Sequence, residues 1–208
     1  MKKIIFDCDG VLFKFQDAIY HILNYVEPDA PWQVGYYYFG FKDFKTARDM
    51  EHTKELSDDK IRQLIKTRKK TIELLVNTDR FSKLEYYPGV IRVFKELKKH
   101  YRMYIASTCD VKRRQERLKN LEPLEMDEKY VHMFKDKDRN TKVHFAKLIK
   151  PDIFVEDQPK NIVALANMGI TVYYPLWHKY AQQTAFRFSE KIIGFKSWED
   201  LGLKLLKQ

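Results

Sequence analysis

The stretch Ile4-Ile5-Phe6-Asp7-Cys8-Asp9-Gly10-Val11-Leu12 decides the fold class of this chain. Its first part, from Lys3 to Asp7, has the length and bulk of a buried β-strand, and Gly10 marks a turn after it. Two carboxylates, Asp7 and Asp9, therefore stand at the carboxyl end of the predicted strand. Because Asp-x-Asp-Gly alone is also a common turn, its meaning depends on the rest of the chain.

From Tyr87-Pro88-Gly89 onward, predicted helices and strands alternate. Apolar spacing predicts helices over 90–99, 111–121, 143–149 and 158–168, and one that begins near 198. Short apolar runs predict strands over 103–106, 130–134, 152–155, 170–174 and 192–195. Strands separated by helices pair in parallel through right-handed crossovers. The sequence thus predicts an α/β fold, a Rossmann-like parallel sheet flanked by helices.

Residues 14–84 interrupt this alternation. A helix is predicted over 15–26, and Ser57-Asp58-Asp59 predicts the start of another that runs to about Val76. Between them lies an aromatic stretch with Trp32, Tyr36, Tyr37, Tyr38, Phe39, Phe41 and Phe44. We expect a small helical cap over 14–84, inserted after the first strand into a catalytic core of residues 1–13 and 85–208.

Polar side chains gather at the predicted strand ends. In open parallel sheets, ligands bind beyond the carboxyl ends of the strands. Three such ends supply four carboxylates and two hydroxyls, and a lysine begins the helix before the last of them: Asp7 and Asp9, Ser107 and Thr108, Glu156 and Asp157, and Lys142. One crevice would therefore hold acids, hydroxyls and an ammonium group.

This mixture suits phosphoryl transfer. A carboxylate nucleophile can attack phosphorus when the charge of the phosphate dianion is screened. Mg²⁺ screens that charge and prefers carboxylate, carbonyl and water ligands. Hydroxyl and ammonium donors hold the remaining phosphoryl oxygens, and a second acid transfers the protons. We therefore expect an enzyme, a Mg²⁺-dependent phosphatase acting on a small phosphorylated substrate.

Three segments resemble motifs of the haloacid dehalogenase superfamily, in the order expected for that family. Ile4 to Leu12 resembles the first motif, Tyr104-Ile105-Ala106-Ser107 the second, and Phe154-Val155-Glu156-Asp157 the fourth. The resemblance covers nearly all of the predicted core and leaves out the insertion. One departure is Asn161, four residues after Asp157, where the longer form of the fourth motif has a second Asp.

The resemblance implies a role for each matching residue. Asp7 would be the nucleophile and Asp9 the general acid/base. Mg²⁺ would be held by the Asp7 carboxylate, the Asp9 backbone carbonyl and the Asp157 carboxylate. Glu156 would support the metal through water or hydrogen bonds.

The phosphoryl group would be held by Ser107, with Thr108 beside it, and by a lysine. Lys142 is favoured because its distance from Glu156 leaves room for a full helix. Lys147 and Lys150 also precede that strand, so the choice between the lysines stays open.

The layout is also similar to the 5′(3′)-deoxyribonucleotidases, which share DxDGV, a short helical cap, Pro-Gly before the next core helix and an acidic-pair-x-Pro ending. This similarity implies a nucleoside 5′-monophosphate substrate, with cap aromatics stacked on the base. The same aromatics could instead form the small core of the cap. Phosphatase or phosphomutase action on a sugar phosphate, or on another small phosphoester, is the alternative.

The chain of 208 residues is basic, with 39 Lys and Arg against 29 Asp and Glu and a net charge of +10. Such a balance attracts anions, so a nucleic-acid-end phosphatase or a basic nucleic-acid-binding protein stays an alternative. The basic runs at 66–70, 95–102 and 112–119 also fit solvated helix faces. Cys8 and Cys109 are expected as reduced thiols.

The N-terminus passes directly into the first strand without the apolar run of a signal peptide. No stretch approaches the ~20 apolar residues that span a bilayer. We therefore expect a cytoplasmic protein without a membrane partner. The sequence leaves the oligomeric state open.

Overall fold

The protein is described from a computed structural model, over residues 1–26, 45, 47, 54–109, 111–135, 141–177 and 189–207. The aromatic stretch of the predicted cap, from Trp32 to Phe44, lies outside these residues. Among the helices so described, none is long and apolar enough to cross a membrane.

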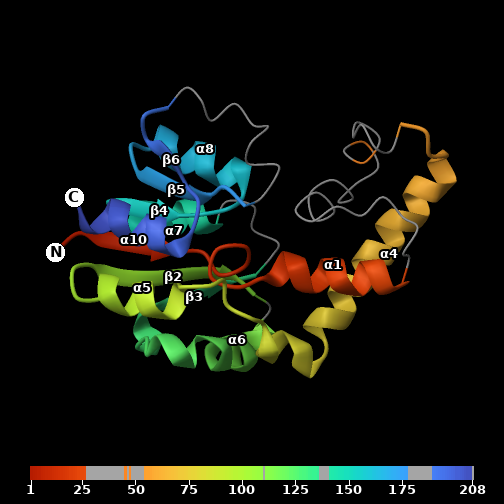
Figure 1. Cartoon of the computed structure of the whole chain (residues 1–208), viewed down its shortest axis with the longest axis horizontal. Coiled ribbons are helices and arrows are strands. Elements are labelled where there is room, and N and C mark those ends of the chain that lie inside the picture. Colours follow the sequence, from red (N-terminus) through yellow and green to blue (C-terminus); the bar gives the residue numbers. More distant parts are fainter. Residues whose placement is uncertain are drawn as a thin grey trace.

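Six strands form one parallel sheet in the order β3-β2-β1-β4-β5-β6 (Figure 1). They are β1 (Lys3–Phe6), β2 (Arg102–Thr108), β3 (Val131–Phe134), β4 (Ile153–Val155), β5 (Thr171–Pro175) and β6 (Ile192–Phe195). The short first strand therefore lies between β2 and β4. This order brings three predicted strand-end motifs to adjacent positions along one edge of the sheet.

Helices cover both faces of the sheet, so the predicted α/β fold is confirmed. They are α5 (Val90–Leu97), α6 (Arg114–Leu121), α7 (Thr141–Ile149), α8 (Pro159–Asn167) and α10 (Trp198–Leu206). Successive residues of β1 point to opposite faces. Phe6 packs with α5 and α10, where its ring centroid lies 5.2 Å from Phe94 and 5.6 Å from Trp198. Ile5 belongs to the second core, with apolar residues of α7 and α8.

Two long helices lie beyond the carboxyl end of β1, away from the edge of the sheet where both chain ends are found (Figure 1). They are α1 (Phe15–Val26) and α4 (Asp58–Val76), and the short 3₁₀ helix η2 (Asp79–Lys83) follows α4. The hydroxyl of Ser57 caps α4 by accepting a hydrogen bond of 3.2 Å from the Lys60 N–H. Whether residues 14–84 form a separate cap domain stays a prediction.

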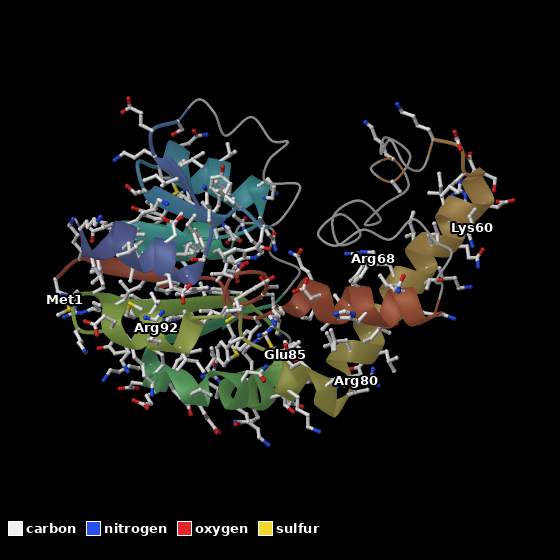
Figure 2. All side chains as sticks on the ribbon, viewed as in Figure 1. Met1, Lys60, Arg68, Arg80, Glu85 and Arg92 are labelled. Carbon is white, nitrogen blue, oxygen red and sulfur yellow. The ribbon has the colours of Figure 1, made fainter. Side chains whose placement is uncertain are left out.

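Basic side chains of α4 and η2 are largely in solvent. In Figure 2, Lys60 lies at the beginning of α4 and Arg80 lies in η2. Lys66, Lys69 and Lys70 of α4 are exposed. On this helix most of the basic run 66–70 is therefore solvated, and Arg68 is half-buried.

The observed helices and strands lie close to their predicted positions, but the 3₁₀ helices η2, η4 (Glu122–Leu124) and η5 (Glu128–Tyr130) were not predicted. The predicted helix over 111–121 is divided into a 3₁₀ turn, η3 (Val111–Arg113), and α6. Both helix types have similar apolar spacing, so the sequence pattern does not separate them.

Candidate active site

The site is built around a tight loop, residues 8–13, that follows β1. Asp7 extends the pairing with β4 by donating its N–H to the Val155 carbonyl at 2.9 Å. The Cys8 carbonyl then accepts the N–H groups of Leu12 (2.8 Å) and Phe13 (3.0 Å), which reverses the chain direction. This reversal leaves the side chains of Asp7 and Asp9 at the sheet edge.

Gly10 allows the loop to lie directly against the end of β4. Its φ is +81°, in the left-handed region that favours glycine. A Cβ at this position would lie 2.2 Å from Asp157 Oδ2. Both conditions explain why the turn after Asp9 carries a glycine.

The Asp7 carboxylate is buried and held at both oxygens. Its Oδ1 accepts the Cys8 N–H at 2.6 Å, and its Oδ2 contacts the Lys142 ammonium. Burial raises the pKa of Asp7 well above its usual value, the neighbouring Glu156 raises it further, and Lys142 opposes the rise. The charged form of Asp7 therefore depends on cations beside it.

Lys142 is the lysine that the structure places at Asp7. It begins the buried side of α7 and is only 5% exposed, with Nζ 3.2 Å from Glu156 Oε2. Burial disfavours its charge, but Asp7 and Glu156 outweigh that effect and raise the pKa of Lys142. Lys147 and Lys150 are exposed.

Glu156 is fully engaged in hydrogen bonds. Its Oε1 accepts the N–H groups of Asp157 (3.1 Å) and Gln158 (3.0 Å), at the start of α8. Its Oε2 accepts from Lys142 and, at 3.1 Å, from the Asn161 side-chain amide. Four donors match the acceptor capacity of a carboxylate. Asn161, where the longer family motif has Asp, thus supports Glu156.

Three acidic groups form a cluster that could hold a metal ion. Asp7, Glu156 and Asp157 are buried, and one oxygen of each lies within 4.8 Å of the others. Only one ammonium group, that of Lys142, contacts this cluster among the described residues. A divalent cation would stabilise buried carboxyl groups that lie this close to one another. Oxygen ligands suit Mg²⁺, so the residues fit such an ion.

Gln16 is a buried neighbour of this cluster that the sequence pattern did not indicate. It is 2% exposed at the start of α1, and its Nε2 donates to Asp157 Oδ2 at 2.9 Å. Its Oε1 is buried and has no hydrogen-bond partner among the residues described. An acceptor in this position could take a hydrogen bond from a metal-bound water.

Asp9 faces a second buried cation, Arg117 of α6. The Arg117 Nη2 donates to Asp9 Oδ1 at 2.7 Å and to Oδ2 at 2.8 Å. The side chain of Asp9 is 25% exposed and that of Arg117 is 0% exposed. Sequence reasoning missed Arg117, although its position four residues before Leu121 predicts the buried side of the helix.

Ser107 and Thr108 lie at the carboxyl end of β2. Ser107 is fully buried next to the Cys8 thiol, whose pKa burial raises to about 12. Thr108 is half-buried. Cys8 and Cys109 are buried free cysteines. All predicted site residues are thus contributed by strand ends β1, β2 and β4 and by α7.

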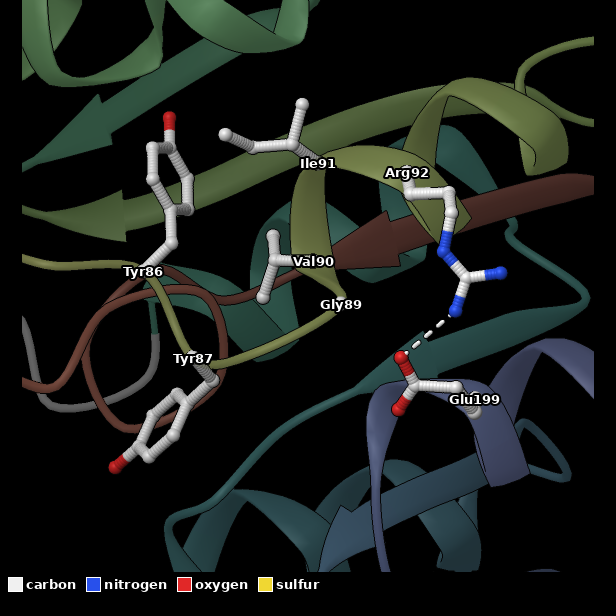
Figure 3. A pocket seen from close by; sticks show the side chains of 7 residues that line it. All are labelled: Tyr86, Tyr87, Gly89, Val90, Ile91, Arg92 and Glu199. Carbon is white, nitrogen blue, oxygen red and sulfur yellow. Dashed lines mark hydrogen bonds and ion pairs between the residues drawn. The ribbon is translucent and has the colours of Figure 1, made fainter.

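A separate pocket of about 360 Å³ lies beside this region, where the chain returns from η2 to α5 (Figure 3). Its lining residues are Tyr86, Tyr87, Gly89, Val90, Ile91, Arg92 and Glu199. Arg92 and Glu199 form an ion pair of 2.9 Å across it. None of the predicted site residues lines this pocket.

Solved structures with the same fold cover nearly the whole chain. A haloacid dehalogenase-like hydrolase from Streptococcus pneumoniae is 18% identical, with a TM-score of 0.59 over 100% of this chain and 97% of that chain. A candidate phosphoglycolate phosphatase from Lactobacillus delbrueckii is 14% identical, with a TM-score of 0.66 over 100% of both chains. A haloacid dehalogenase-like protein of unknown function from Agrobacterium tumefaciens is 18% identical, with a TM-score of 0.66 over 100% and 98%.

At such low identity these structures support the fold alone. No curated protein has a sequence that matches the chain. The narrower resemblance to deoxyribonucleotidases is not found in these comparisons and stays a prediction. The family model described as haloacid dehalogenase-like hydrolase matches residues 1–169, which include all of the predicted site residues. The chain therefore belongs to the haloacid dehalogenase-like hydrolases.

Proposed function

We propose that this hydrolase is a Mg²⁺-dependent phosphatase that forms an aspartyl-phosphate on Asp7. One observation carries the proposal: Asp7 is buried with one oxygen held by a backbone N–H and the other by the Lys142 ammonium. Such a carboxylate is fixed in direction and lies beside a positive charge, as a nucleophile attacking a phosphate dianion requires.

In the first step, the Asp7 carboxylate attacks phosphorus and the bond from phosphorus to the ester oxygen breaks. Asp9, in its protonated form, gives its proton to the departing alkoxide. Lys142 and the Ser107 hydroxyl hold the phosphoryl oxygens as charge develops on them.

In the second step, water attacks the phosphorus of the aspartyl-phosphate and the carboxylate of Asp7 leaves. Asp9, now a carboxylate, takes a proton from that water. Inorganic phosphate is released and the starting protonation of Asp9 is restored.

A bound Mg²⁺ would be held by the carboxylates of Asp7 and Asp157 and by the backbone carbonyl of Asp9. It would supply positive charge that neutralises the phosphate dianion. Glu156 would support this site indirectly, since its oxygens already accept four hydrogen bonds.

The substrate that we propose is a nucleoside 5′-monophosphate. Residues 14–84 would act as a cap that excludes water, and aromatic residues of the stretch 32–44 would stack on the base. The second candidate is a small acidic phosphoester, because phosphoglycolate phosphatase is the description of two structural relatives, a candidate from Lactobacillus delbrueckii and a predicted one from Haemophilus somnus.

The test is phosphate release from nucleotides, sugar phosphates and phosphoglycolate, with Mg²⁺ or with a chelator, in wild type and Asp7→Asn. We expect Mg²⁺-dependent turnover of nucleotides that the substitution abolishes. Turnover confined to phosphoglycolate or sugar phosphates would replace the nucleotide proposal and keep the mechanism. A folded protein without turnover on any monoester would overturn the proposed function and favour the binding of nucleic acid.

A further inference from the structure

The structure assigns to Arg117 the role of positioning Asp9 for proton transfer to the leaving group. This inference rests on the proposed function, because it concerns the residue proposed as the general acid. No motif resemblance includes Arg117, and it lies 108 positions from Asp9 in the sequence.

Arg117 holds both oxygens of Asp9 with a single nitrogen. Its Nη2 lies 2.7 Å from Oδ1 and 2.8 Å from Oδ2, so the carboxyl group has one preferred orientation. Asp9 is 25% exposed. Without Arg117, this side chain could rotate toward solvent and away from the reacting phosphoryl group.

The guanidinium is itself fixed between two aromatic rings. Its central carbon lies 5.2 Å from the ring centroid of Phe13, at the end of the loop 8–13, and 4.6 Å from that of Phe81 in η2. One turn further along α6, Asn120 donates to the Phe81 carbonyl at 2.7 Å. The loop, η2 and α6 therefore hold Arg117 together.

A role limited to stability does not account for this arrangement. Arg117 is 0% exposed, and its Nε and Nη1 have no hydrogen-bond partner among the residues described. A buried charge with unsatisfied donors is costly, and an apolar side chain between two phenyl rings would avoid that cost. The contact with Asp9 is what the charge provides.

A positioning role and a purely stabilising role of Arg117 predict different effects of the leaving group on the rate. A p-nitrophenolate leaves without a proton, whereas an alkoxide needs one from Asp9. The ratio kcat/KM includes steps only as far as the first irreversible one, here phosphoryl transfer to Asp7. A misplaced Asp9 therefore lowers kcat/KM for an alkyl phosphate and spares p-nitrophenyl phosphate, whereas general damage lowers both.

The experiment compares Arg117→Met with Arg114→Met, a matched change on the same helix. Arg114 is 39% exposed and lies 3.7 Å from Glu128, outside the site. Because general acid catalysis contributes roughly 10²–10⁴-fold, Arg117→Met should lower kcat/KM for an alkyl phosphate by at least ~30-fold. For p-nitrophenyl phosphate the loss should stay below ~3-fold, Arg114→Met should match wild type, and Arg117→Lys should recover part of the alkyl phosphate activity.

Equal losses on both substrates with Arg117→Met would overturn the inference and leave the proposed function intact. Absence of turnover of any phosphomonoester by the folded wild type would overturn the proposed function, and this inference with it. If Arg117→Met does not fold, Phe81→Leu replaces it. That change removes one of the two aromatic rings that contact the guanidinium. It should lower kcat/KM for alkyl phosphates by a smaller factor and leave p-nitrophenyl phosphate unaffected. Equal losses of kcat/KM on both substrates would again overturn the inference.

Discussion

Of the three candidate lysines Lys142, Lys147 and Lys150, Lys142 is the most restricted, since its ammonium contacts both Asp7 and Glu156. In Lys142→Met we expect kcat to fall by about 10²–10³-fold, because a preorganised charge at the phosphoryl group is lost. The matched control is Lys147→Met, which removes an exposed lysine of the same helix. Steady-state kinetics with any accepted phosphomonoester measures both. A loss in the Lys147 variant as large as that in the Lys142 variant would contradict the site.

Gly10 and Gly169 form a natural pair for testing how closely the loop 8–13 approaches Asp157. Both have left-handed φ values, +81° and +83°, but an added Cβ meets Asp157 Oδ2 at 2.2 Å in the first and nothing within 4 Å in the second. We expect Gly169→Ala to lower the free energy of unfolding by about 1–2 kcal/mol through backbone strain alone. Gly10→Ala should cost more, and chemical denaturation measures the difference. Equal losses of unfolding free energy in the two variants would mean that the loop does not lie in close contact with Asp157.

Among the elements, the sheet was the part best predicted from the sequence. Parallel strands are buried on both faces and read as short apolar runs, so β1, β2 and β4 were recognisable together with the side chains at their ends. Helix α4 was predicted from its cap at Ser57. These signals are local, as are the motifs that carry the family resemblance.

The sequence could not predict contacts that depend on distant partners. Arg117 is charged within a strongly basic run, and only its contact with Asp9 explains its burial. The burial of Gln16 is likewise explained only by its hydrogen bond with Asp157, 141 positions away. The distance to Glu156 favoured Lys142 over Lys147, but its contacts with Asp7 and Glu156 depend on how α7 packs against the sheet.

Strand β3 carries a titratable group, His132, whose ring lies 4.2 Å from that of Phe145 in α7. Desolvation lowers the pKa of His132, and the nearby Arg114 adds to this effect. The unfolded chain therefore binds more protons, so the free energy of unfolding should fall as pH drops through about 6.5, the unfolded pKa, toward the lower folded value.

Denaturation of wild type and His132→Gln between about pH 5 and 8 tests this dependence. In the variant, the free energy of unfolding should fall less steeply as the pH is lowered into the acid range. At the upper end of the range the histidine is neutral in both states, so the two proteins should differ there only by lost packing. If the free energy of unfolding of the variant falls as steeply with decreasing pH as that of wild type, other groups cause the pH dependence.

At the scale of the whole molecule, the acidic cluster should couple metal binding to folding. A ligand that binds only the folded state stabilises it by about 2.7 kcal/mol at 100 times its dissociation constant. We expect Mg²⁺ to raise the Tm of wild type, and this rise to be largely absent in Asp157→Asn. The control is Asp152→Asn, on an exposed residue before β4, which should keep the Mg²⁺ response. Equal responses in the two variants would contradict a metal site at Asp157.

The proposed reaction requires Asp7 to become covalently phosphorylated. The most direct measurement is acid quenching during turnover of a substrate with a radiolabelled phosphoryl group, followed by detection of label on the chain. We expect label that survives acid, is released by hydroxylamine as an acyl phosphate is, and is absent in Asp7→Asn. Label on another residue, or wild-type turnover in Asp7→Asn, would contradict it.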